Sequence, residues 1–185
     1  MRPKFAATLL SLAIAIPALA MTVAGVNLDD HATVNGQTLV LNGAGLRKKL
    51  FIKVYVGGLY IGAKNSNPQT IMGTDSPRRQ VMHFLYSVSK NQMCDAWDEG
   101  LEQNTKNAPA EVKNAFKTLC SWMEPIPKGN RLVLTYVPGT GTTVEVNGKM
   151  KGTLPGKATA DAILATWIGP DPAPGQDFKN AVLGK

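Results

Sequence analysis

Several residue types that carry chemistry occur in this sequence, but few have the spacing of a reaction centre. Gly43-Ala44-Gly45 begins like a dinucleotide-binding loop, yet Lys48 stands where a third glycine is needed. Asp95, Asp98 and Glu99 supply carboxylates, but their spacing is typical of the solvated face of a helix. The sequence therefore favours neither nucleotide binding nor catalysis by paired carboxylates.

The N-terminal residues have the pattern of a secretory signal peptide. A short basic segment, Met1 to Lys4, precedes an apolar run from Phe5 to Pro17, and Ala18-Leu19-Ala20 supplies small residues for cleavage. The alternative is an uncleaved anchor, but the run is shorter than the ~20 apolar residues of a membrane span. We expect cleavage near Ala20, no transmembrane segment, and a periplasmic or secreted protein.

Histidine and cysteine are too sparse for a metal centre. His31 and His83 lack neighbouring ligands, and Cys94 and Cys120 are the only cysteines. An even number of cysteines in an exported chain indicates a disulfide. We expect a Cys94–Cys120 disulfide, no metal and no cofactor.

Composition restricts the class of protein and its partners. Of the 185 residues, 44% are hydrophobic and 18% are charged, which excludes a disordered chain. The formal net charge is +7, but the basic residues form short groups and no long stripe with aromatic residues. We expect no nucleic-acid partner and a single domain over residues 21–185, most simply a monomer, with an oligomer left open.

Strand patterns dominate both sides of a central helical region. Asn35-Gly36 between apolar segments predicts a hairpin, and residues 51–61 read as a strand interrupted by Gly57-Gly58. This interruption indicates a bulge or a close approach of another backbone. Alternation also predicts strands over 79–88, 131–137 and 142–146, with a short strand before Pro155.

Helical spacing appears in the middle and at the end of the chain. Met93, Trp97 and Leu101 recur every four residues after Ser89, a second helix is predicted over 109–123, and the tail is helical from Thr159. A Cys94–Cys120 bridge would join the first two helices as an antiparallel pair. The elements together predict an α+β fold, a large and mainly antiparallel sheet with a helical layer on one face.

Two motifs resemble the chalcone isomerase superfamily, and the segment between them resembles its bacterial, exported branch. The first is Gly43-Ala44-Gly45-Leu46-Arg47 leading into Phe51–Ile61, and the second is Leu164-Ala165-Thr166-Trp167-Ile168-Gly169. The resemblance implies an open-faced sandwich with a cleft between sheet and helices. In the plant enzymes an arginine and a threonine in such a cleft assist the closure of a flavonoid ring, and Arg47 and Thr166 match these two positions.

The strand threonine of the plant enzymes is replaced here by Tyr55. In the fatty-acid-binding branch of the superfamily, an arginine and a tyrosine at these places hold the ligand carboxylate. The resemblance therefore implies a non-catalytic protein that binds a small apolar carboxylate through Arg47, Tyr55 and Thr166. A guanidinium and a phenol are suitable donors for this anion.

Three alternatives stay open at this level. The chain could be an isomerase, an intramolecular lyase acting on a chalcone-like enone through Arg47 and Thr166, or a structural module without a ligand. Arg47 could also be a structural residue of a turn, and Thr166 an inert helix position. Strand alternation adds a conflict, because Tyr55 faces away from Val54 and Val56 and leaves the core unless the Gly57-Gly58 irregularity intervenes or the sheet is covered on both sides.

Overall fold

The computed structural model describes residues 20–185. The expected signal peptide lies almost entirely outside these residues, and only Ala20, the expected cleavage position, is included. The elements in chain order are β1 (Ala20–Val23), β2 (Val26–Asp29), β3 (His31–Val34), β4 (Gln37–Lys49), β5 (Ile52–Ile61), α1 (Pro68–Gly73), β6 (Arg78–Phe84), α2 (Lys90–Asn104), α3 (Ala110–Trp122), β7 (Arg131–Val137), β8 (Gly141–Val146), β9 (Lys149–Leu154), α4 (Lys157–Ile168) and α5 (Gln176–Val182).

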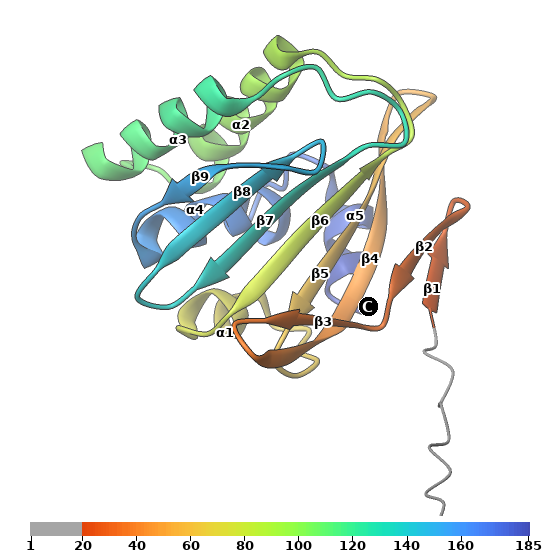
Figure 1. Ribbon diagram of the computed structural model, residues 1–185, viewed down its shortest axis with the longest axis horizontal. Coiled ribbons are helices and arrows are strands. Elements are labelled where there is room, and N and C mark those ends of the chain that lie inside the picture. Colours follow the sequence, from red (N-terminus) through yellow and green to blue (C-terminus); the bar gives the residue numbers. More distant parts are fainter. Residues whose placement is uncertain (1–19) are drawn as a thin grey trace, which may run out of the picture.

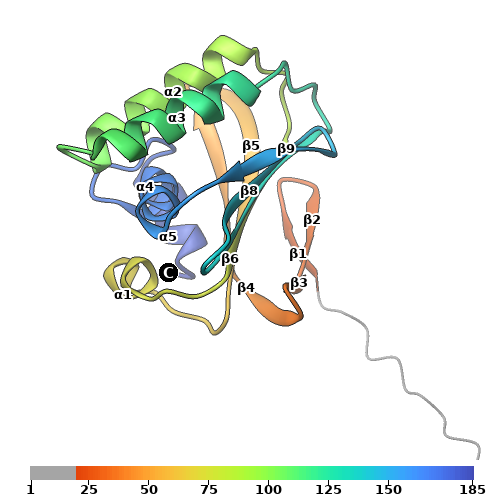
Figure 2. The same ribbon diagram turned by 60° about the vertical axis from the view of Figure 1, so that its left-hand side comes forward.

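A curled antiparallel sheet of seven strands forms the centre of the fold. Its order is β3-β4-β5-β6-β7-β8-β9, so every strand pairs with its neighbours in the sequence. Helices α2 to α5 pack on the concave side, and α4 lies between the sheet and the pair α2–α3 (Figures 1 and 2). The predicted α+β class, with a large antiparallel sheet and a helical layer, is confirmed.

The predicted hairpin at Asn35-Gly36 joins β3 and β4. Both residues have positive φ, +47° and +74°. A two-residue turn of this kind matches the twist of the flanking strands. Local turn chemistry therefore determines how the first strand pair of the sheet begins.

The sheet is covered on both sides over β4, β5 and β6, which resolves the conflict at Tyr55. The β1–β2 hairpin packs on the convex side (Figure 2), where Val56 is buried, while Tyr55 is buried on the side of the helices. Adjacent residues of β5 thus enter two different apolar clusters. A near-continuous apolar strand is expected when both faces of a sheet are buried.

Gly57-Gly58 marks a close approach and does not form the alternative bulge. Pairing of β5 is continuous through both glycines, whereas the register shifts lie at Leu41/Gly43 and at Arg47/Lys48. A Cβ atom on Gly57 would lie 2.5 Å from the ring of Phe178 and 2.9 Å from that of Trp167. The absent side chain therefore makes room for aromatic rings from α5 and α4.

Gly43 and Gly45, which precede Arg47 on β4, also allow a helix to approach the sheet closely. A Cβ atom on Gly43 would lie 2.2 Å from the Ala181 carbonyl oxygen, and one on Gly45 would lie 2.9 Å from Phe178. Since alternate residues of a strand share a face, Gly43, Gly45 and Arg47 all face the helices. Helix α5 packs on Gly43 and Gly45, and Arg47 is the next residue on this face of β4.

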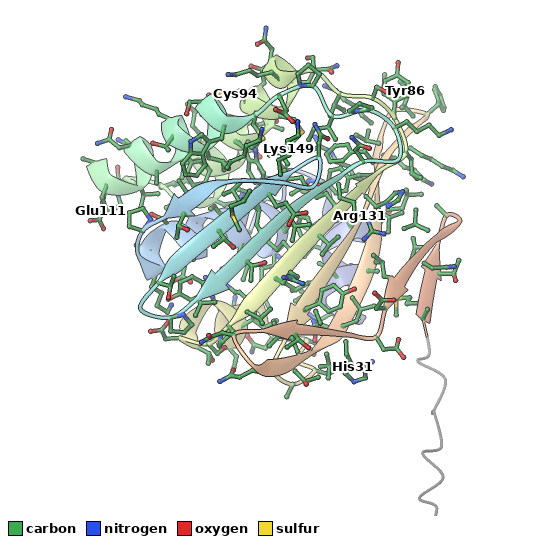
Figure 3. All side chains as sticks on the ribbon, in the orientation of Figure 1. His31, Tyr86, Cys94, Glu111, Arg131 and Lys149 are labelled. Carbon is green, nitrogen blue, oxygen red and sulfur yellow. A yellow bond between two sulfur atoms is a disulfide. The ribbon has the colours of Figure 1, made fainter. Side chains whose placement is uncertain are left out.

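Helices α2 and α3 run antiparallel and are joined by a disulfide. Ser89 caps α2 in a reciprocal capping box with Gln92, as expected from the change of period at this residue. The Cys94 and Cys120 sulfur atoms are 2.01 Å apart, and Cys94 is labelled on α2 in Figure 3. No helix within residues 20–185 has the length and hydropathy of a membrane span.

We expect Gly57→Ala to lower the free energy of unfolding by about 1–3 kcal/mol, because the new methyl group overpacks the contact with Phe178 and Trp167. The matched control is Gly62→Ala, where a Cβ atom meets nothing within 4 Å. Urea denaturation of both variants measures the difference. Equal stability of the two variants would contradict the close approach at Gly57.

Candidate functional site

Arg47 and Tyr55 are direct partners on neighbouring strands. They lie opposite each other in the β4–β5 register, so both side chains project toward the helices. The Arg47 guanidinium carbon Cζ lies 5.7 Å from the centroid of the Tyr55 ring. This distance lies within the ~6 Å range of a cation–π contact. The structure thus places two of the three predicted site residues in direct contact.

Aromatic rings hold Tyr55 on three sides. Its ring centroid lies 5.5 Å from that of Phe84, 6.2 Å from that of Trp167 and 5.7 Å from that of Phe178. Burial raises the pKa of the Tyr55 phenol, and the neighbouring Arg47 cation only partly offsets this effect. At neutral pH the phenol therefore keeps its proton and remains a hydrogen-bond donor.

Arg47 is half-buried, and its charge is not neutralised by an ion pair within residues 20–185. The ion pairs of this part of the chain are Arg78–Asp161, Lys157–Asp161 and Lys151–Glu124. A cation removed partly from water without a counterion loses hydration free energy, and the Tyr55 ring face offsets only part of this loss. Arg47 therefore provides a positive site for an anion that the described residues do not supply.

An outer cavity of about 150 Å³ opens beside Arg47 and Tyr55, between β5 and α2. Its lining is mostly apolar, with a polar rim. The apolar residues are Ile52, Val54, Phe84, Val88, Met93 and Ala96, and the rim carries Lys49, Tyr86, Gln92, Asp95 and Glu99. Asp95 and Glu99 are exposed, in agreement with the predicted solvated face of the helix. They also border the opening of this cavity. An apolar group would enter this cavity with its polar end toward Arg47.

A second, smaller cavity of about 20 Å³ is lined by the same two residues. Its lining includes Trp97, Thr166 and Trp167, together with Arg47 and Tyr55. A space of this size holds a single water molecule or one polar atom of a ligand. Arg47 and Tyr55 therefore line both cavities, and both linings are mostly apolar.

Trp97 is a site residue that the sequence interpretation missed. Its indole Nε1 is buried and has no hydrogen-bond partner among the residues that the structure describes. A buried donor without a partner costs about 1–3 kcal/mol. The helical spacing of Trp97 predicts a core position, and Trp97 is buried. Spacing alone does not show that its indole nitrogen lacks a hydrogen-bond partner.

Thr166 lines the smaller cavity, and its side chain packs on α2. A Cβ atom on Gly100 would lie 2.9 Å from the Thr166 side chain, so this glycine allows α2 and α4 to approach closely. The Thr166 hydroxyl donates a hydrogen bond of 2.8 Å to the Ile163 carbonyl oxygen. Thr166 therefore sets the position of Trp97 and Ala96, one helical turn before Gly100, and its hydroxyl proton is already engaged.

The arrangement offers donors for an anion and no cluster of metal ligands. Within residues 20–185, no group of three or more His, Cys, Asp and Glu side chains is placed to hold a metal ion. The guanidinium, the phenol and the indole N–H are all donors; Arg47 and Tyr55 line both cavities, and Trp97 lines the smaller one. This geometry suits an amphiphile whose polar end carries a negative charge.

Comparison with solved structures finds the same fold in a plant protein. A fatty-acid binding protein of Arabidopsis thaliana superposes with a TM-score of 0.68 over 89% of this chain and 96% of that chain, at 18% sequence identity. At this identity the likeness establishes the fold alone. A search of curated proteins finds no match in sequence.

The family is established by the sequence itself. Residues 20–184 match the family described as chalcone isomerase-like, and this range includes both motifs that carry the resemblance. The match therefore covers all of the sheet, the helical layer and the site around Arg47. This chain belongs to the chalcone isomerase-like family.

Proposed function

We propose that this protein binds a small apolar carboxylate, such as a fatty acid, and does not convert it. The observation that carries the proposal is the half-buried Arg47, which has no ion pair among the described residues and lies between an apolar cavity and a buried phenol. A planar guanidinium binds a carboxylate through two parallel hydrogen bonds. The head group would lie against Arg47 and Tyr55, and the tail would enter the outer cavity.

The protonation state of Tyr55 supports binding over catalysis. Because burial raises its pKa, the phenol is a donor and a poor general base at neutral pH. The Thr166 hydroxyl already donates to a backbone carbonyl. The described donors therefore stabilise an anion that is already present, and none of them is prepared to remove a proton.

The size of the outer cavity limits how much of a ligand is enclosed. A cavity of about 150 Å³ holds a molecule of roughly the size of benzene. By the same measure, roughly the first six to eight carbons of a straight-chain carboxylate fill the enclosed space. The rest of a longer chain would leave the cavity past Ile52 and Tyr86, which are both exposed.

The plant protein of similar fold is described as a fatty-acid binding protein, which agrees with this ligand class. We further propose that the chain acts in the periplasm or outside the cell, as a member of the exported branch, after cleavage near Ala20. The signal-like pattern of residues 1–20 and the Cys94–Cys120 disulfide both suit an oxidising compartment.

We expect Arg47→Ala to weaken octanoate binding at least tenfold, because a charge-assisted hydrogen bond contributes about 1.5–3 kcal/mol. Isothermal titration calorimetry measures the change. The control is Arg131→Ala, since Arg131 is an exposed arginine on β7 that lines neither cavity.

Three results would count against the proposal. Wild-type affinity in Arg47→Ala would remove Arg47 from the site, and an absence of octanoate binding by the wild type would leave a structural module. Cyclisation of a chalcone faster than in buffer, followed by its absorbance, would make the protein an isomerase.

We expect Trp97→Phe to weaken octanoate binding severalfold with little loss of stability, because phenylalanine keeps the aromatic packing and removes the Nε1–H donor. The control is Trp122→Phe on α3, whose ring packs on Gly152 away from both cavities. Calorimetry and thermal melting of both variants provide the test. Unchanged affinity in Trp97→Phe would show that the indole donor does not contact the ligand.

We expect the affinity for straight-chain carboxylates to rise about fourfold per added methylene, from ~0.8 kcal/mol each, and to level off beyond about eight carbons. A calorimetric series from butanoate to tetradecanoate measures this dependence. An even increase through the whole series would contradict the enclosed volume, and no increase would contradict burial of the tail.

A further inference from the structure

The turn between β4 and β5 exposes apolar side chains at its tip. Phe51 is 100% exposed, Leu50 is 87% exposed and Ile52 is 44% exposed. Leu50 also has a φ of +55°, in the left-handed region that a leucine rarely adopts. The backbone thus accepts a costly conformation that leaves two large apolar side chains in water.

Lysines surround this tip. Lys48 and Lys49 precede it, Lys53 follows it, and all three are exposed. None of them takes part in the ion pairs of residues 20–185. Lysine stems lie along apolar surface while their ammonium groups reach outward, so the tip combines an apolar point with a positive collar.

The tip adjoins the opening of the outer cavity. Lys49 and Ile52, which flank Leu50 and Phe51, both line that cavity, as does the half-exposed Tyr86. Tyr86 lies at the same end of the molecule as the β4–β5 turn (Figure 3). A surface that contacts the tip therefore also contacts the rim of the cavity.

We propose that this tip docks on a bilayer of anionic phospholipids, with Leu50 and Phe51 inserted and Lys48, Lys49 and Lys53 at the level of the head groups. The argument is charge complementarity: a basic collar around an apolar point matches negative head groups above hydrocarbon. A second copy of this chain fits less well, because a symmetric contact would place the same lysines against each other.

Docking in this orientation sets the Lys49, Ile52 and Tyr86 side of the outer cavity's mouth against the membrane surface, whereas Asp95 and Glu99 border the opening from α2. If the cavity takes the carboxylate proposed above, the ligand can pass between bilayer and protein without crossing water. The docking itself does not depend on that ligand, since Leu50 and Phe51 line neither cavity beside Arg47. The two proposals can therefore fail separately.

The test is sedimentation of residues 21–185 with vesicles of 3:1 phosphatidylcholine to phosphatidylglycerol and with vesicles of phosphatidylcholine alone. We expect binding to the anionic vesicles that falls with added salt, and at least tenfold weaker binding for the double variant Leu50→Ser, Phe51→Ser. The triple variant Lys48→Gln, Lys49→Gln, Lys53→Gln should lose the preference for anionic vesicles. The matched control is Met150→Ser, because Met150 is 65% exposed between two lysines on β9.

Circular dichroism and octanoate binding in solution keep the test interpretable. The Leu50, Phe51 double variant should retain both, so that loss of vesicle binding cannot come from misfolding or from a damaged cavity. Wild-type vesicle binding in the double variant would overturn the proposal. A monomer–dimer equilibrium that the double variant abolishes, without vesicle binding by the wild type, would overturn it in favour of a second copy.

Discussion

The positive charge of Arg47 at the edge of an apolar space is the feature on which this site depends. The Arg47 guanidinium lies over the Tyr55 ring, 5.7 Å from its centroid, and no carboxylate of the described residues lies within ion-pair distance of it. Partial burial makes the loss of hydration costly, and the ring face recovers only part of it. A bound anion that also carries apolar surface can offset the remaining loss of hydration.

The rest of the fold holds that charge in place. Gly43 and Gly45 let α5 lie directly on β4, and Gly57 lets Phe178 and Trp167 reach the sheet beside Tyr55. The same row of alternate residues that begins with these glycines continues to Arg47, beyond the part of β4 that α5 covers. On the other side, Gly100 brings α2 against α4, and α2 contributes Met93, Ala96 and Trp97 to the walls. Close contacts at these glycines thus set the width of the site.

Local chemistry in the sequence was sufficient for most of the architecture. Asn35-Gly36 predicted a hairpin because its turn needs two positive φ values, and Ser89 predicted the start of α2 because a hydroxyl can cap it. Arg47 and Tyr55 were identified through a family resemblance, and their pairing across β4 and β5 follows from the register. These features depend on residues close in sequence or on strands joined by a short turn.

What the sequence could not provide depends on distant contacts. Alternation along β5 left Tyr55 without a definite side, because one strand does not reveal that the β1–β2 hairpin covers the second face. Helical spacing assigned Trp97 to the core, but the missing partner of its Nε1 follows only from the positions of all its neighbours. The division of the cleft into a large and a small cavity depends on the same packing.

A crystal structure of residues 21–185 with octanoate tests the central claim most directly. The account predicts the carboxylate within hydrogen-bond distance of the Arg47 guanidinium and the Tyr55 hydroxyl, with the tail lying among Val54, Phe84 and Met93. A carboxylate bound elsewhere, with Arg47 turned into solvent and the cavity filled by side chains, would contradict it.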